Sequence, residues 1–256
     1  DSFVSFRFPE EQGISYYVGE DPNNEGNKIA ANGYHTAGLG SPATFKAKIS
    51  DPLSGKGDLE FTAQNNGVVN TTVSGDTAII EIENVKESAD ITLESYKVLK
   101  IDKSEYISGY YSDDSLTEEH KFKNDDPVFT KGMAVKGTTK FYVKLDSDKI
   151  KIDNDCKIKV TAGDNNVEVT RLNTKDVHAF EISIRTLQSA TVEFSGVSTV
   201  NFPSGNVENL KVYESDPSTL MPITTEDMKG PVPFATGTTY KVVAQIPRDA
   251  IGEFSV

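Results

Sequence analysis

Apolar and polar residues alternate along most of this chain. A period of two places one set of side chains on a core and the other in water, as in a half-buried β-strand. The alternation runs through residues 45–49, 59–63, 80–83, 91–94, 141–145, 158–161, 180–184 and 192–194. Asn, Asp, Gly and Pro residues separate these runs, and no long segment carries a helical stripe. The pattern predicts an all-β protein of short strands arranged as sandwiches.

The same pattern returns further along the chain. Residues 59–63 and the Asn/Gly turn after them resemble residues 158–162 and the Asp/Asn turn that follows. The Gly-Thr-Thr of 137–139 recurs at 237–239, and the Phe-Pro of 8–9 recurs at 202–203. The repeat length of about 100 residues is the size of one Ig-like sandwich.

We therefore predict tandem Ig-like antiparallel β-sandwiches, with repeat 1 at 1–96, repeat 2 at 97–196 and a partial repeat 3 at 197–256. Repeat 1 should have seven strands, near 3–8, 14–19, 34–39, 44–49, 58–64, 78–83 and 90–98. Repeat 3 holds only four or five of these strands, too few to close a sandwich. We expect it to be either truncated or completed by another strand, for example from a neighbouring chain.

Several short motifs resemble the Ig-like modules of large surface proteins of Gram-positive bacteria. They are Phe-Arg-Phe-Pro at 6–9, Phe-Thr-Ala-Gln-Asn-Asn-Gly at 61–67, Ile-Glu-Asn-Val at 82–85 and Asp-Ile-Thr-Leu at 90–93. Repeat 2 matches at 141–145, 160–166 and 182–194, but lacks the Asn-Val pair at 184–187. The resemblance implies an extracellular, cell-surface or cell-wall location and a stalk, adhesion or accessory binding role, with no catalytic residues.

Charge and composition narrow the function classes. The chain has 39 acidic and 26 basic residues, a formal net charge of −13, which disfavours binding to nucleic acid or anionic membranes. No apolar stretch approaches the roughly 20 residues that span a bilayer. There is no nucleophile elbow or phosphate loop, and His35, His120 and His178 lack a metal-ligand spacing. We expect a non-enzymatic protein with no nucleic-acid partner and no direct membrane insertion.

One acidic group is a candidate metal site. Asp146, Asp148, Asp153 and Asp155 flank the apolar positions of 150–152. Clustered carboxylates can supply the six to eight oxygen ligands that calcium prefers. The spacing does not match a helix–loop–helix calcium loop, and the alternative is a set of solvated acidic loops. Calcium is the one cofactor that the sequence suggests.

Two tyrosine pairs, Tyr16-Tyr17 and Tyr110-Tyr111, stand at related places in the first two repeats. Adjacent strand residues point to opposite faces, so one tyrosine of each pair is expected in the core and the other outward. An outward ring could stack on a sugar. The alternative is a packing tyrosine, and the absence of tryptophan weakens the idea of a sugar platform.

The sequence therefore favours part of an extracellular surface protein that acts as a stalk, an adhesion module or a protein-interaction module. Its partner would be a host or bacterial surface protein or glycan. One alternative is a carbohydrate-binding module of a polysaccharide-degrading or adherence system. Another is an S-layer or filament subunit that assembles by strand pairing.

Overall fold

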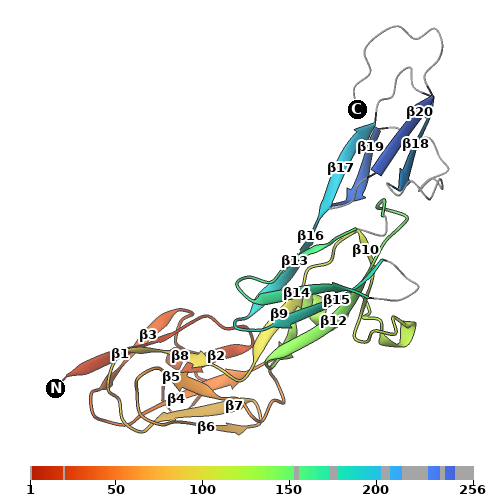
Figure 1. Ribbon diagram of the computed structural model, residues 1–256. Helices are drawn as coiled ribbons and strands as arrows, with labels where there is room; N and C mark the ends of the chain where they lie inside the picture. The colour runs from red at the N-terminus through yellow and green to blue at the C-terminus, as the bar shows by residue number, and fades with distance from the viewer. Residues whose placement is uncertain are drawn as a thin grey trace.

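The computed structural model confirms the prediction of an all-β protein (Figure 1). It describes residues 2–19, 21–152, 156–172, 178–202, 208–214, 230–236 and 240–245. Helical structure in this part of the chain is limited to two 3₁₀ turns, η1 (Glu25–Asn27) and η2 (Glu118–His120), and one short helix, α1 (Pro127–Thr130).

The first unit consists of eight strands in two facing sheets. They are β1 (Phe3–Phe8), β2 (Ile14–Tyr17), β3 (Gly33–Gly38), β4 (Ala43–Ile49), β5 (Phe61–Ala63), β6 (Val69–Ser74), β7 (Thr77–Ile82) and β8 (Ala89–Leu93). One sheet has the order β3-β1-β8-β5 and the other β2-β4-β7-β6.

The second unit repeats this topology strand for strand. Its members are β9 (Lys97–Ile101), β10 (Ile107–Tyr111), β11 (Met133–Val135), β12 (Thr138–Leu145), β13 (Lys159–Thr161), β14 (Asn166–Arg171), β15 (Ala179–Arg185) and β16 (Ala190–Ser195). They form sheets of order β11-β9-β16-β13 and β10-β12-β15-β14. Each position in the first unit thus has a counterpart in the second.

The third unit has four described strands, which pair in two separate ribbons. β17 (Val197–Phe202) pairs with β19 (Gly230–Ala235), and β18 (Glu208–Glu214) pairs with β20 (Tyr240–Gln245). These pairings are those of β1 with β3 and of β2 with β4. The described strands therefore correspond to the first half of a unit.

The strand pattern differs from the sequence prediction in three details. The first unit has eight strands in place of the seven predicted, since β6 was not among them, and the second unit has the equivalent additional strand, β14. The strand expected at 90–98 is two strands, β8 of the first unit and the start of β9 of the second. The sheets are antiparallel except at one place in each unit, where the first strand runs parallel to the last, β1 beside β8 and β9 beside β16.

Each complete unit has its own hydrophobic core, formed by the inward residues of the alternating strands. In the first core the ring of Phe45 packs edge-on against Phe6 and Phe8, with centroids 5.6 and 5.0 Å apart. In the second, Tyr110 and Phe141 pack around Phe194. Such edge-to-face contacts add to the stabilisation that burial provides.

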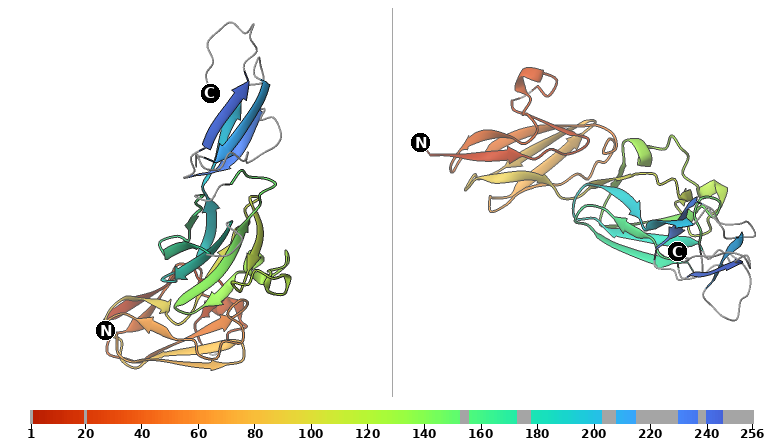
Figure 2. Two further views of the ribbon diagram at one scale, coloured as in Figure 1. Left: turned by 45° about the vertical axis from the view of Figure 1, so that its right-hand side comes forward. Right: turned by 90° about the horizontal axis from the view of Figure 1, so that it is seen from above.

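The units follow one another end to end (Figures 1 and 2). Only residues 94–96 lie between β8 and β9, and only Gly196 lies between β16 and β17. Linkers this short bring the end of one unit against the start of the next, so the junctions are packed.

Candidate functional site

The first tyrosine of each predicted pair lies in a core. Tyr16 packs against Phe8 and Phe61, with ring centroids 5.0 and 6.1 Å apart. Its hydroxyl is buried and has no hydrogen-bond partner. Burial, and next the charge of Glu11, raises the pKa of Tyr16. This residue supports packing in the first unit.

Tyr110 takes the same place in the second unit. Its ring packs against Phe129, at 5.3 Å between centroids. Its hydroxyl accepts a hydrogen bond from the backbone N–H of Ser104 at 2.8 Å. Burial raises the pKa of Tyr110 to about 12, and Asp102 acts in the same direction, while the Ser104 hydrogen bond opposes them. The neutral phenol is therefore the form that the fold accommodates.

The second tyrosine of each pair points away from the core, and a loop covers it. The loop after Tyr17 folds back, so that Lys28 makes an isolated β-bridge with Tyr17. The Tyr17 hydroxyl donates to the Glu25 carboxylate at 3.2 Å, and Glu25 also pairs with Lys28 at 3.4 Å. The 3₁₀ turn η1 thus closes over the ring.

Tyr111 is covered in the same way. Lys121 makes the equivalent β-bridge with Tyr111 and pairs with Glu118 at 3.0 Å. On the strand side, the ring lies over Gly109, where an added Cβ would fall 2.4 Å from the Tyr111 hydroxyl oxygen. Only glycine leaves room there, so the second outward tyrosine is enclosed from two sides.

The tyrosines therefore do not form an exposed platform. As the alternation predicts, one ring of each pair packs in a core and the other does not, but all four rings are at most 6% exposed. Sugar stacking needs an open ring face. Ligand binding by Tyr16, Tyr17, Tyr110 and Tyr111 stays a prediction, with no exposed ring face to support it.

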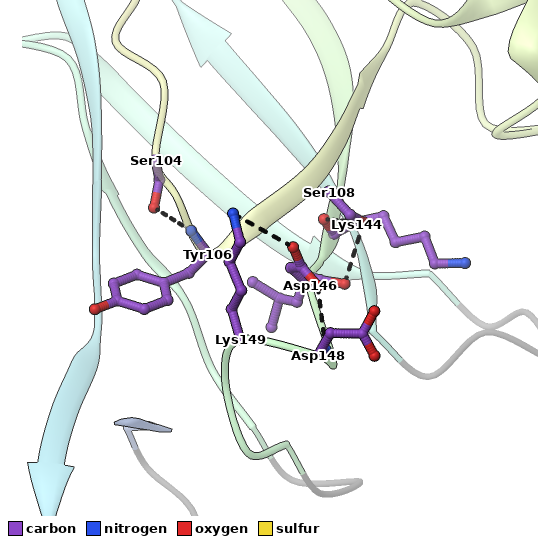
Figure 3. Close-up of polar contacts among 8 residues, drawn as sticks. Ser104, Tyr106, Ser108, Lys144, Asp146, Asp148 and Lys149 are labelled. Atoms are coloured by element: carbon purple, nitrogen blue, oxygen red, sulfur yellow. Dashed lines mark hydrogen bonds and ion pairs between the residues drawn. The ribbon is translucent and has the colours of Figure 1, made fainter. Parts of the chain in front are cut away.

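The predicted calcium group lies partly outside the described residues, because Asp153 and Asp155 are not among them. The carboxylate of Asp146 accepts a hydrogen bond from the backbone N–H of Asp148 at 3.1 Å and lies 3.8 Å from the Lys149 ammonium (Figure 3). Asp146 thus orders the turn after β12. No group of three or more possible metal ligands occurs in the described ranges, and calcium binding stays a prediction.

The histidines and the cysteine lie on different elements. His35 is on β3 with its ring edge-on to Phe45, His120 ends η2, and His178 directly precedes β15. Cys156 is buried, and its sulfur accepts a hydrogen bond from the Arg171 guanidinium at 3.3 Å. These contacts give each of His35 and Cys156 a packing role.

A cavity of about 470 Å³ lies where the second unit meets the third. It lies between the β9–β10 connection, the loop after β12, and the segment that joins β16 to β17. Its lining mixes apolar side chains with the acids Asp102, Glu105 and Glu193 and with Tyr106. Its volume falls in the range of small-molecule sites, which often lie between domains. No sequence motif marks this cavity, because its lining comes from separate segments of the chain, at 102–107, 145–158, 193–197 and 235.

Tyr106 and Phe194 are the aromatic residues in the lining of this cavity, and Tyr106 lies beside the acidic turn after β12. Its backbone N–H donates to the Ser104 hydroxyl at 3.3 Å, and its carbonyl accepts from the Asp146 N–H at 2.8 Å. These bonds fix the backbone on both sides of the residue. In Figure 3 the Tyr106 ring points away from Asp146. The predicted acidic turn and the cavity are therefore neighbours.

Backbone hydrogen bonds join the second and third units at the same place. The N–H of Lys151 donates to the Pro233 carbonyl at 2.9 Å, and the Ala235 N–H donates back to the Lys151 carbonyl at 3.0 Å. The Thr236 N–H donates to Gly196 at 2.8 Å. The loop after β12 thus pairs with β19 of the next unit.

The first junction is made mainly by side chains. The hydroxyl of Tyr96 donates to the Asp58 carboxylate at 2.9 Å, and this bond holds the pKa of Asp58 below its usual value. Lys136, from the second unit, lies 3.4 Å from Asp58. Lys131 pairs with Asp51 across the junction at 3.0 Å. In both junctions, the loop after the fourth strand contacts the third-strand region of the next unit.

Comparison with known proteins does not assign the chain to a family. No family model matches it, and no curated protein matches it significantly. No helix in the described residues is long and apolar enough to cross a bilayer. The repeated fold and its junctions are therefore the features of the chain that bear on its function.

Proposed function

We propose that this chain is part of a non-enzymatic extracellular surface protein, in which Ig-like units act as a stalk that presents an adhesion or protein-interaction surface. One observation carries the proposal. The same two-sheet topology recurs end to end, and contacts between units replace flexible linkers at both junctions. A spacer needs this arrangement, because tandem units project a surface only if they do not fold back on one another.

Distance measurement by spin labelling tests the stalk. Thr36 and Glu168 are exposed strand residues of the first and second units, and Cys156 is buried and poorly reactive as a background thiol. A Thr36→Cys/Glu168→Cys pair should give one narrow distance distribution. A control with a flexible Gly/Ser insertion after Ser95 should broaden it. A broad distribution without the insertion would contradict the proposal.

The location and the partner need separate tests. Antibodies against the chain should label intact source cells before permeabilisation, and staining only after permeabilisation would contradict a surface location. Binding of beads coated with the protein to host or bacterial surfaces tests adhesion. If the coated beads bind to no surface but the spin-label distance distribution is narrow, the spacer role is supported and the adhesive role is excluded.

Glycan binding is a second candidate function, and the cavity beside Tyr106 is the observation that favours it. The lining contains both an aromatic residue and three acidic residues, the two kinds of group that stack on sugar rings and accept hydrogen bonds from sugar hydroxyls. Retention on an affinity gel of starch, xylan or mucin tests it. Tyr106→Ala should abolish retention, whereas Tyr34→Ala, which removes a ring 66% exposed in the first unit, should not. Equal retention of both variants would exclude the cavity as the site.

A further inference from the structure

The second unit is connected to its neighbours through its first and last strands. Residues 94–96 join β8 to β9, and Gly196 alone joins β16 to β17. The three units follow one another end to end (Figure 1). Tension along this row of units therefore enters the second unit at the start of β9 and leaves it at the end of β16.

These two strands lie side by side and run in the same direction. Leu99 is opposite Ala190, and Ile101 is opposite Val192. Tension pulls β9 toward the first unit and β16 toward the third, so the two strands are drawn past each other along their own axes. The load then falls on all the hydrogen bonds between them at once. In an antiparallel pair that is pulled apart from one end, the bonds would instead open one after another.

The packing of both strands opposes such sliding. Leu99, Ile101 and Val192 are at most 1% exposed, and all three belong to the core of the second unit. A slip of one residue, about 3.3 Å, would withdraw these side chains from their places in the core. The strands therefore meet their resistance within a short displacement.

Further hydrogen bonds cross the pair at both of its ends. The backbone N–H of Val98 donates to the Ser189 hydroxyl at 2.8 Å. At the other end, the N–H of Asp102 donates to the Val192 carbonyl at 2.9 Å. Both bonds connect the strand that receives the load to the strand that passes it on, so they share the tension with the bonds of the ladder.

The first unit has the same arrangement between its first and last strands. β1 and β8 are parallel, and the N–H of Ser5 donates to the Ser88 hydroxyl at 3.0 Å, as Val98 does to Ser189. The Arg7 guanidinium also makes two hydrogen bonds to the Asp90 carboxylate across this pair, at 2.9 and 3.1 Å. The device therefore recurs with its serine bond in both complete units.

We infer that the two complete units are force-bearing modules, in which the parallel pair of first and last strands resists tension along the chain. The pair β9–β16 carries the load in the second unit, and β1–β8 is the equivalent pair in the first. This inference deepens the stalk function and rests on it for the tension itself. A spacer needs only packed junctions, whereas a stalk that holds under tension also needs units that resist being pulled open.

Optical-tweezers unfolding of the full chain with two sets of handles tests the inference. In the sliding geometry, thiol-linked handles at Glu94→Cys and Ser195→Cys load β9 and β16 in the direction described above. In the opening geometry, handles at Thr138→Cys and Arg185→Cys pull β12 and β15 apart from one end, because these two residues are opposite each other in an antiparallel pair. All four positions are exposed, and Cys156 is buried.

The sliding geometry should need an unfolding force at least about twofold higher, because sliding meets its barrier within about 3.3 Å, whereas opening one opposed residue pair extends the chain by about 7 Å. The same work is then done over half the distance. The released contour length, about 3.5 Å per residue, shows that the second unit has opened. Equal forces in the two geometries, or a lower force in the sliding geometry, would overturn the inference.

Two serine substitutions separate the loaded pair from general stability. Ser189→Ala removes the acceptor of the Val98 N–H and should lower the unfolding force more in the sliding geometry than in the opening geometry. Ser108→Ala is the matched control, because the Ser108 hydroxyl donates to the carbonyls of Lys144 and Leu145, at 3.2 and 3.3 Å, outside the loaded pair. If both substitutions lower the sliding force equally, the β9–β16 pair does not set that force and the inference fails.

This test and the spin-label test of the stalk can fail separately. Equal forces with a narrow distance distribution would leave a spacer whose units are not built to bear tension. A higher force in the sliding geometry with a broad distance distribution would support force-bearing units and contradict the rigid stalk.

Discussion

Two consecutive residues of β9 belong to different cores, and this gives the sharpest prediction about how the units are joined. Val98 is on the first strand of the second unit, yet it is buried in the core of the first. Leu99, the next residue, is buried in the core of the second. We predict that Val98→Ala destabilises the first unit and that Leu99→Ala destabilises the second.

The magnitudes follow from burial. Val98→Ala removes two buried carbon atoms, about 0.8 kcal/mol each in transfer free energy. The space left behind adds to this, because an added Cβ at Gly132 would lie only 2.6 Å from a Val98 methyl group, so the surroundings are close-packed. We expect a loss of about 2 kcal/mol, and for Leu99→Ala about 2–5 kcal/mol. A loss of about 2 kcal/mol lowers the melting temperature of a unit this size by roughly 10 °C.

Hydrogen exchange followed by mass spectrometry separates the two units. Peptides from β4 and β7 report on the first core, and those from β12 and β15 report on the second. Val98→Ala should speed exchange in the first set and Leu99→Ala in the second. The reasoning is refuted if both substitutions act on the second set alone.

Three further predictions concern the covered tyrosines and the first junction. Gly109→Ala should lower the free energy of unfolding by about 1–3 kcal/mol in urea titrations, because the new methyl group collides with the Tyr111 ring. Stability should fall between pH 10 and 12, because the raised pKa of Tyr110 favours its neutral form in the fold; urea midpoints at pH 9 and pH 11.5 measure this loss. Lys131→Ala should cost less than about 1 kcal/mol, because Lys131 and Asp51 are both exposed, and this loss should shrink in 1 M salt.

Each of these has a matched control. Gly57→Ala adds a methyl group where nothing lies within 4 Å, so its stability should stay unchanged. Tyr110→Phe should cost about 1 kcal/mol at neutral pH, because the N–H of Ser104 loses its acceptor. The same variant should lose less stability than the wild type between pH 10 and 12. An identical alkaline loss in both proteins would show that Tyr110 is not responsible.

The apolar/polar alternation predicted most strands, because their inward positions are apolar. It missed a strand in which one inward position is polar. β6 reads Val-Asn-Thr-Thr-Val-Ser, and the middle inward position is occupied by Thr71. This strand is at the edge of its sheet, where it covers only the rim of the core, so threonine is tolerated. An apolar/polar pattern counts threonine as polar and does not detect the alternation. The parallel pairing of first and last strands leaves no periodic signal either.

The candidate sites were harder to predict, because the outward tyrosines are covered by loops that lie outside the strands. Alternation places one tyrosine of each pair on the outer face, and the structure shows that these are Tyr17 and Tyr111, but alternation says nothing of loops that return over them. A signal was present, since a Glu-x-x-Lys segment follows each tyrosine, at 25–28 and at 118–121. Without coordinates, that spacing is indistinguishable from an ordinary surface ion pair. The junction cavity has no local signal, because each of its segments contributes only a few residues.

The two junctions are stabilised by different contacts, and these contacts decide how each junction resists rotation or bending of one unit against the next. At the first, the second unit cannot rotate about 94–96 without withdrawing Val98 from the first core, which costs about 1.5–3 kcal/mol of apolar burial.

At the second junction, the loop after β12 adds hydrogen bonds to β19, and Gly196 holds a positive φ of 104°. Bending there requires several backbone bonds to break together. Salt weakens exposed ion pairs but leaves buried apolar contacts and backbone hydrogen bonds largely intact. The relative orientation of the units should therefore be insensitive to ionic strength, as expected of a spacer whose geometry depends on packing and main-chain pairing more than on surface charge.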